Sequence, residues 1–158
     1  MPLITLDQDT IEDAFAARLE GLDVSDYTQG DNTSGDVKLR RSRRPFHLVS
    51  GAAQAHLEFV CDVAESVNTD QRRDAGEAFV RSRLSLLVAY KIRSDTAIED
   101  KRLAQHLARR MGARVNETDA RFDVHLLIPY RARWAPAGEF LLVEIVLDVS
   151  HDYDLTVA

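Results

Sequence analysis

The chain has 158 residues, of which 45% are hydrophobic and 29% charged, and a formal net charge of −6. This length and apolar content suffice for one sizeable core, so we expect residues 1–158 to form a single domain. No stretch of about 18 apolar residues could span a bilayer, and the first residues lack the basic and apolar regions of a secretory signal, so we expect no membrane contact and assembly in the cytoplasm. Cys61, the one cysteine, cannot form an intrachain disulfide and is interpreted as a small buried hydrophobe.

A first helix is predicted over residues 11–22. Its apolar residues, which recur at near-helical spacing, are Ile11, Phe15, Leu19 and Leu22. Gly21 lies where such a helix would end. The next stretch is rich in Gly, Ser, Asn, Asp and Arg and poor in large apolar residues. Residues 23–54 therefore have the composition of a long, mobile insertion loop.

Two strands joined by a polar connection are predicted next. The alternating apolar residues of the first are Leu57, Phe59, Cys61 and Val63. Those of the second, between Arg83 and Arg93, are Leu84, Leu86, Val88, Tyr90 and Ile92. A period of two indicates strands with one buried face. The connection from Asn68 to Gly76 suits a hairpin, although residues 70–80 also have the spacing of a helical turn.

A second helix is predicted from Asp95 to Met111. Ser94, Asp95 and Thr96 are candidate N-caps, and Glu99 would complete a capping box with Thr96. The apolar stripe consists of Leu103, Leu107 and Met111, flanked by Ile98, Ala104 and Ala108. Its basic residues, Lys101, Arg102, Arg109 and Arg110, are expected to stay solvated. Gly112 is expected to end the helix as a C-terminal cap.

The last two strands again show a period of two. Their alternating apolar residues are Phe122, Val124, Leu126, Ile128 and Tyr130, and then Leu141, Val143, Ile145, Leu147 and Val149. Pro136 and Gly138 mark the turn between them. The order helix, strand, strand, helix, strand, strand predicts an α+β fold, with two helices on one face of a mostly antiparallel four-stranded sheet.

Charge is segregated along the chain. Nine acids up to Asp36 are opposed only by Arg18, and a basic cluster follows: Lys38, Arg40, Arg41, Arg43 and Arg44. Arginine forks bind phosphate oxygens, so the cluster is a candidate nucleic-acid contact. The alternative is that it balances acids of the same chain or of a neighbouring copy. The overall acidity of the chain favours the alternative.

Catalytic and metal-binding motifs are not found. The five histidines show no metal-ligand spacing, and no phosphate-binding glycine loop occurs, so no metal and no cofactor are expected. Glu144 and Asp148 lie about 13 Å apart on an extended strand, too far to share a proton. An enzyme would need a site assembled around His125 and His151, for which a hydrogen-bonded or solvated histidine is the simpler interpretation.

The chain resembles the tail terminator proteins of long-tailed bacteriophages and related prophage particles. The resemblance lies in the order of elements, in the N-terminal amphipathic helix, in the capped helix from Asp95 to Met111 that follows the strand from Arg83 to Arg93, and in the strand-rich ending from Phe140 to Tyr153. It covers most of the chain except residues 23–54. It implies a structural virion protein without catalytic residues. Such a protein forms a hexameric ring on the tail tube, ends tube polymerisation and helps to join the tail to the head. Other neck proteins of such phages are close alternatives.

The resemblance also suggests which residues would serve assembly. Leu142 and Val146 lie on the second face of a strand that is already apolar on its first, so they could meet a neighbouring copy, as could the basic cluster. Candidates for an acidic lumen that lets DNA pass without specific binding are Glu144, Asp148, Asp152 and Asp154. Expected partners are further copies of the chain, the tail tube protein and the head-tail connector.

Overall fold

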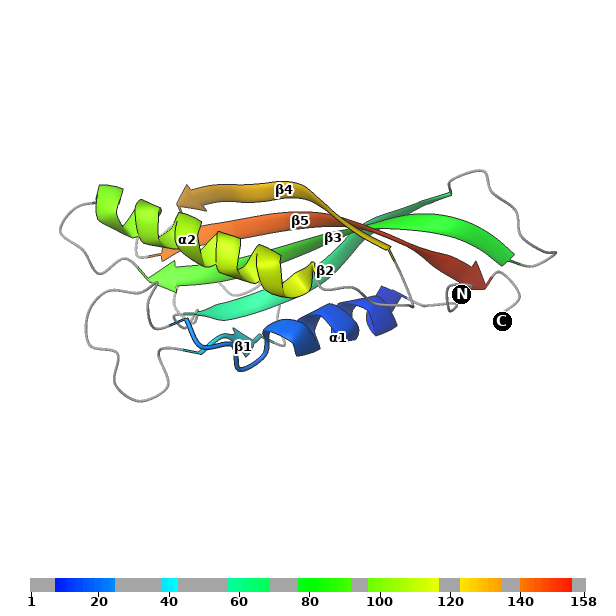
Figure 1. Ribbon diagram of the computed structural model, residues 1–158, viewed down its shortest axis with the longest axis horizontal. Helices are drawn as coiled ribbons and strands as arrows, with labels where there is room; N and C mark the ends of the chain where they lie inside the picture. The colour runs from blue at the N-terminus through cyan, green and yellow to red at the C-terminus, as the bar shows by residue number, and fades with distance from the viewer. Residues whose placement is uncertain are drawn as a thin grey trace.

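The computed structural model describes residues 8–24, 38–42, 57–68, 77–91, 97–116, 123–134 and 140–154. They form an α+β fold in which two helices pack against a mixed, mostly antiparallel sheet (Figure 1). The elements are α1 (Gln8–Leu19), β1 (Arg40–Arg41), β2 (Glu58–Asn68), β3 (Glu77–Lys91), α2 (Ala97–Val115), β4 (Asp123–Trp134) and β5 (Phe140–Asp154). No helix within these ranges is long and apolar enough to cross a bilayer.

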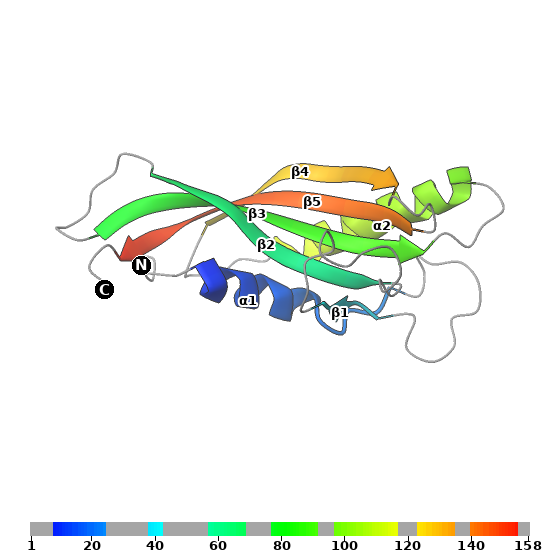
Figure 2. The ribbon, with the colours of Figure 1, turned by 180° about the vertical axis from the view of Figure 1, so that it is seen from behind.

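The strand order is β1-β2-β3-β5-β4. The two longest strands, β3 and β5, lie at the centre and pair antiparallel from Glu77↔Asp154 to Lys91↔Phe140. β4 forms one edge, and β1 lies parallel to β2 at the other. Seen from behind, the sheet lies in front of α2 and curves along its length (Figure 2). The two edges therefore differ in strand length, direction and neighbours.

The predicted alternation identifies the face of the sheet that meets the helices. Leu84, Leu86, Val88 and Tyr90 of β3 are buried, and their partners on β5 are Leu147, Ile145, Val143 and Leu141. We call this side the helix face and the other the second face. Ile11, Phe15 and Leu19 of α1 and Leu107 and Met111 of α2 join the same apolar cluster. α1, α2, β2, β3 and β5 thus bury the stripes that their sequence periods predict, whereas the predicted stripe of β4 is interrupted and Leu126 is 38% exposed.

The four-stranded prediction is wrong because β1 adds a fifth strand. It lies within residues 23–54, which were expected to form a loop. Leu39 is fully buried, the Arg40 N–H donates to the Leu57 carbonyl oxygen at 3.1 Å, and Asp23 forms an isolated bridge with Lys38. A two-residue strand is too short to show a period, so composition alone cannot reveal it.

The sequence predicts that Gly112 ends the second helix. In the structure Gly112 instead lies within α2. α2 continues to Val115, which is fully buried and extends the stripe of Leu107 and Met111 by one turn. A Cβ at Gly112 would lie 3.5 Å from Leu126 Cδ2, so the glycine lies against β4. Gly21, in contrast, has a φ of 78° just after α1, as expected for a helix end.

Two other parts of the sequence prediction can be compared with the structure. β3 begins at Glu77, so the helical-turn alternative for residues 70–80 is wrong where it overlaps the strand. β4 carries register shifts between Leu126 and Ile128 and between Ile128 and Arg131, so its alternation is interrupted. Ser94, Asp95, Thr96, Ile92 and Phe122 lie outside the described residues.

Candidate functional site

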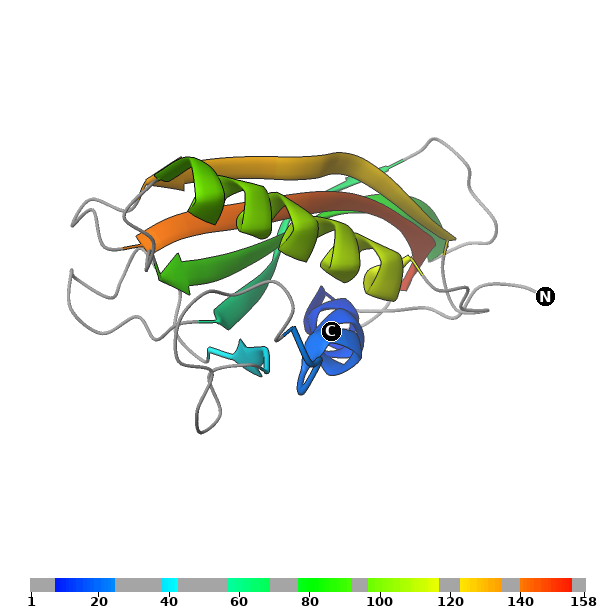
Figure 3. The same cartoon turned by 60° about the vertical axis from the view of Figure 1, so that its left-hand side comes forward.

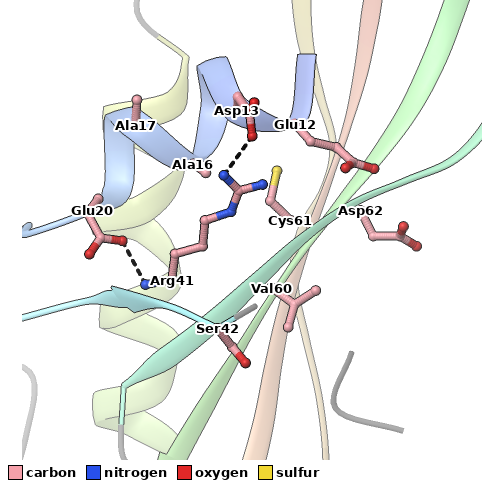
Figure 4. Close-up of a pocket in the computed structure, with 10 residues that line it drawn as sticks. All are labelled: Glu12, Asp13, Ala16, Ala17, Glu20, Arg41, Ser42, Val60, Cys61 and Asp62. Atoms are coloured by element: carbon pink, nitrogen blue, oxygen red, sulfur yellow. Dashed lines mark hydrogen bonds and ion pairs between the residues drawn. The ribbon is translucent and has the colours of Figure 1, made fainter. Parts of the chain in front are cut away.

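A groove of about 620 Å³ lies between α1, β1 and β2 (Figure 4). α1 and the residue after it contribute Glu12, Asp13, Ala16, Ala17 and Glu20. β1, the residue after it and β2 contribute Arg41, Ser42, Val60, Cys61 and Asp62. Four carboxylates and one guanidinium therefore line it, which makes the groove acidic. Asp13 and Glu20, seven positions apart, point in similar directions, and Glu12 lies about 100° from Asp13 around the helix, so the three acids share one half of its circumference.

The α1 acids hold β1 through Arg41. A guanidinium nitrogen of Arg41 donates to Asp13 Oδ1 at 2.7 Å, and its backbone N–H donates to Glu20 Oε2 at 2.7 Å (Figure 4). Arg41 therefore balances acids of its own chain, which was one of the two interpretations of the basic cluster. Lys38 and Arg40 are exposed on the same segment. Arg43 and Arg44 lie outside the described residues.

Cys61 lies in the groove but is unsuited to nucleophilic chemistry. Its burial, and next the negative charge of Glu12, raise the pKa of the thiol far above its ordinary range. The thiolate is the reactive form, so this environment makes Cys61 inert at neutral pH. Glu12 also accepts a hydrogen bond from the backbone N–H of Val63 at 2.9 Å, which satisfies a donor at the edge of β2.

The predicted lumen acids share the second face but are not a bare acidic surface. Glu144 accepts hydrogen bonds from Ser85 and from Arg131, whose Nε lies 2.7 Å from its Oε1. Asp148 lies 3.6 Å from Arg83 and 3.9 Å from Arg81. Most of the negative charge is therefore compensated by neighbouring strands. Asp152 is buried, and the side chain of Asp154 lies outside the described part of the structure.

The predicted apolar contact residues are covered within the single chain. Leu142 is 6% exposed and Val146 is 3% exposed. Leu142 packs with Phe140 and Ala89 in a second, smaller apolar cluster. These two side chains thus offer little surface to a neighbouring copy. The apolar exposure of the β4 edge strand is larger, with Leu126 at 38% and Leu127 at 45%.

The two histidines of the enzyme alternative lie on opposite faces. His125 pairs in register with Asp148 on the second face and is exposed, whereas His151 pairs with Val80 on the helix face and is fully buried. The sheet therefore separates them, and they cannot act on one substrate. In the described ranges no cluster of His, Cys, Asp and Glu could hold a metal ion.

His151 belongs to a buried hydrogen-bond chain that the sequence did not predict. Its Nδ1 lies 2.9 Å from the Asp152 carbonyl oxygen, so Nδ1 carries the proton and Nε2 accepts from the Ser82 hydroxyl at 2.8 Å. Ser66 lies 2.8 Å from Ser82 Oγ. Burial lowers the pKa of His151, against the opposing effects of the bond to Asp152 and of its charge. Ser82 and His151 are fully buried and Ser66 is exposed at the β2 end, so this network joins β2, β3 and β5.

Comparison with protein-family models finds no match to this chain, and none of the curated proteins matches it significantly.

Proposed function

We propose that this protein is a tail terminator of a long-tailed bacteriophage or a phage-like particle. It would form a ring, hexameric in the family that the sequence resembles, at the end of the tail tube in the virion neck. There it would stop tube polymerisation and contact the head-tail connector, and DNA would pass through the ring without specific binding. Assembly would take place in the host cytoplasm.

The observation that carries the proposal is the difference between the two edges of the sheet, with the groove at the β1 and β2 edge and β4 at the other. One edge presents the acidic groove of α1, β1 and β2, and the other edge presents β4 with exposed Leu126 and Leu127. Closed rings are built from head-to-tail contacts, in which two different surfaces of one subunit meet. Exposed apolar side chains on an edge strand are a typical component of such contacts.

Two parts of the sequence prediction give the proposal less support. Leu142 and Val146 are buried, so the ring contact is assigned to β4 instead. Glu144 and Asp148 are paired with arginines, so the charge of a lumen formed by the second face would be mixed. The proposal keeps the ring and its position and does not depend on an acidic lining.

Tube assembly provides the test. Purified protein is added to polymerising tail tube protein of the same particle, and tube lengths and ends are measured by electron microscopy. The expected result is shorter tubes with a ring at one end. Uncapped tubes of unchanged length would refute the proposal. A ring found between connector and terminator, with no effect on tube length, would identify one of the other neck proteins.

A matched pair of variants tests the β4 contact. Leu127 and Val67 are both 45% exposed, on β4 and β2 respectively. Leu127→Asp should weaken capping by at least about 30-fold, as expected for an apolar residue at the centre of an interface. Val67→Asp should cap like the unchanged protein. Equal effects of the two substitutions would exclude β4 as the contact.

A further inference from the structure

The exposed side of α2 carries several basic side chains and no acidic one among those described. Lys101, Arg102, Arg109 and Arg110 are exposed, and they lie on the outside of a 19-residue helix that runs along the sheet (Figure 3). Among the side chains described for α2, the one acid is Asp100, which is fully buried. We call the four cations the α2 basic face. Its positive charge is opposite in sign to the net charge of the whole chain, which is −6.

An apolar residue borders this face. Leu126 of β4 lies beside Gly112, where a Cβ would be 3.5 Å from Leu126 Cδ2, and it is 38% exposed. The α2 basic face therefore combines positive charge with a neighbouring apolar side chain. Protein interfaces commonly have this composition, with arginine and large apolar residues together.

The groove has the complementary composition. Glu12, Asp13, Glu20 and Asp62 line it with Arg41, and Ala17 of α1 is a further lining residue. Asp13, Glu20 and Asp62 are exposed. The guanidinium of Arg41 binds Asp13, whereas Glu20 binds only the Arg41 backbone N–H, so the four carboxylates leave the groove with an excess of negative charge.

We infer that the α2 basic face of one copy docks in the acidic groove of the next copy. The groove opens at the β1 and β2 edge, whereas α2 lies on the same face of the sheet but contacts β4 and β5, towards the opposite edge. The two surfaces therefore differ and belong to separate parts of the molecule, so each copy can use both at once. This is a head-to-tail contact, which continues from copy to copy. The inference names the interface of the ring and in that sense rests on the proposed function, but self-association can be measured without a tail tube.

Charge-reversed variants test the contact. The face variant is R102E/R109E, and the groove variant is A17K/D62K, which spares the acids that hold Arg41. Circular dichroism and urea unfolding establish that both fold. Sedimentation of the unchanged protein at low salt should show association that increases with concentration and weakens with added salt. Each variant alone should associate about 100-fold more weakly, because like charges then face each other.

Mixing the two variants gives the decisive result. The reversed face of one fits the reversed groove of the other, and their unchanged surfaces also fit, so an equimolar mixture should restore association with copies alternating. Failure of the mixture to associate, or an unchanged protein that stays monomeric at about 200 µM and low salt, would overturn the inference. If the face variant loses binding to a labelled DNA duplex while association is unaffected, the α2 basic face contacts a polyanion and the inference is wrong.

A cross-link locates the contact. A17C places a thiol in the groove, and Q105C places one in the middle of the exposed side of α2. A mixture of these variants should form disulfide-linked dimers, whereas A17C mixed with V67C should not. Equal cross-linking in both mixtures would contradict the contact. Capping of tubes by a protein that does not cross-link would refute this interface and leave the terminator role intact. Association through this contact without capping of tubes would support the interface and refute the terminator role.

Discussion

Arg18 and Arg114 each bind the backbone at the end of the other's helix. Arg18 Nη1 on α1 donates to the Val115 carbonyl oxygen at 2.6 Å, and Arg114 Nε on α2 donates to the Arg18 carbonyl oxygen at 3.1 Å. Both acceptors lie in a last helical turn, where carbonyls lack intrahelical donors and the helix dipole is negative. The two helices therefore cap each other, which fixes their relative position over the sheet.

Loss of Arg18 should destabilise the fold. Its guanidinium caps α2 and also lies 5.0 Å from the centre of the Phe15 ring. Arg18→Ala should lower the free energy of unfolding by about 2 kcal/mol, because a charged donor is removed from a part-buried carbonyl. Urea unfolding followed by circular dichroism measures this. Arg133→Ala, at an exposed position on β4, is the control and should change stability by less than about 0.5 kcal/mol. Equal effects of the two substitutions would contradict the capping role.

Substitution by alanine should change stability in opposite directions at Gly112, which lies within α2, and at Gly21, which follows α1. At Gly112 an added Cβ meets Leu126 at an ordinary contact distance, so Gly112→Ala should stabilise the protein by about 0.5–1 kcal/mol through the helix propensity of alanine. At Gly21 the φ of 78° disfavours any Cβ, so Gly21→Ala should destabilise it by about 1 kcal/mol. Thermal unfolding of both variants provides the comparison. Destabilisation by Gly112→Ala would show that α2 approaches β4 more closely than described.

Stability should fall in mild acid because of His151. Burial lowers its pKa in the folded state below the ordinary value of 6.5, so the unfolded chain binds the proton more readily. The free energy of unfolding therefore decreases as the pH falls from about 6.5 towards the lower folded-state pKa. His151→Gln should be less stable at pH 7.5, where it loses the bond with Ser82, and should show a shallower decrease between pH 7 and 5.5. His125→Gln, at an exposed position, should keep the original slope. An unchanged slope in His151→Gln would exclude this histidine as the source.

Cys61 should resist modification in the folded protein. Its thiol is buried and its raised pKa keeps it protonated, so at pH 8.5 iodoacetamide should label it at least about 100-fold more slowly than a free thiol. Mass spectrometry measures the labelling. The same protein unfolded in about 8 M urea should react at the rate of a free thiol. Rapid labelling without denaturant would mean that α1 and β2 separate readily at the groove.

The long elements other than β4 could be predicted because each buries one side along most of its length. On β3 the alternating residues Leu84, Leu86, Val88 and Tyr90 are buried as expected. On α1 Ile11, Phe15 and Leu19 form one stripe and are also buried. Both patterns follow from local geometry, in which side chains repeat every two residues in a strand and about every 3.6 in a helix. The sequence alone therefore determined the α+β class, the identity of the four long strands and the side that each of these elements except β4 turns to the core.

Only the tertiary structure decided which charged and apolar side chains remain available on the surface. The pairing of Glu144 with Arg131 depends on the register between β4 and β5, including two shifts that no periodic pattern encodes. The burial of Leu142 and Val146 depends on neighbours from other strands. The acidic groove requires α1, β1 and β2 to meet across residues distant in the chain. Periodicity records how each segment faces the core, whereas a surface arises from contacts between segments, which a single sequence does not record.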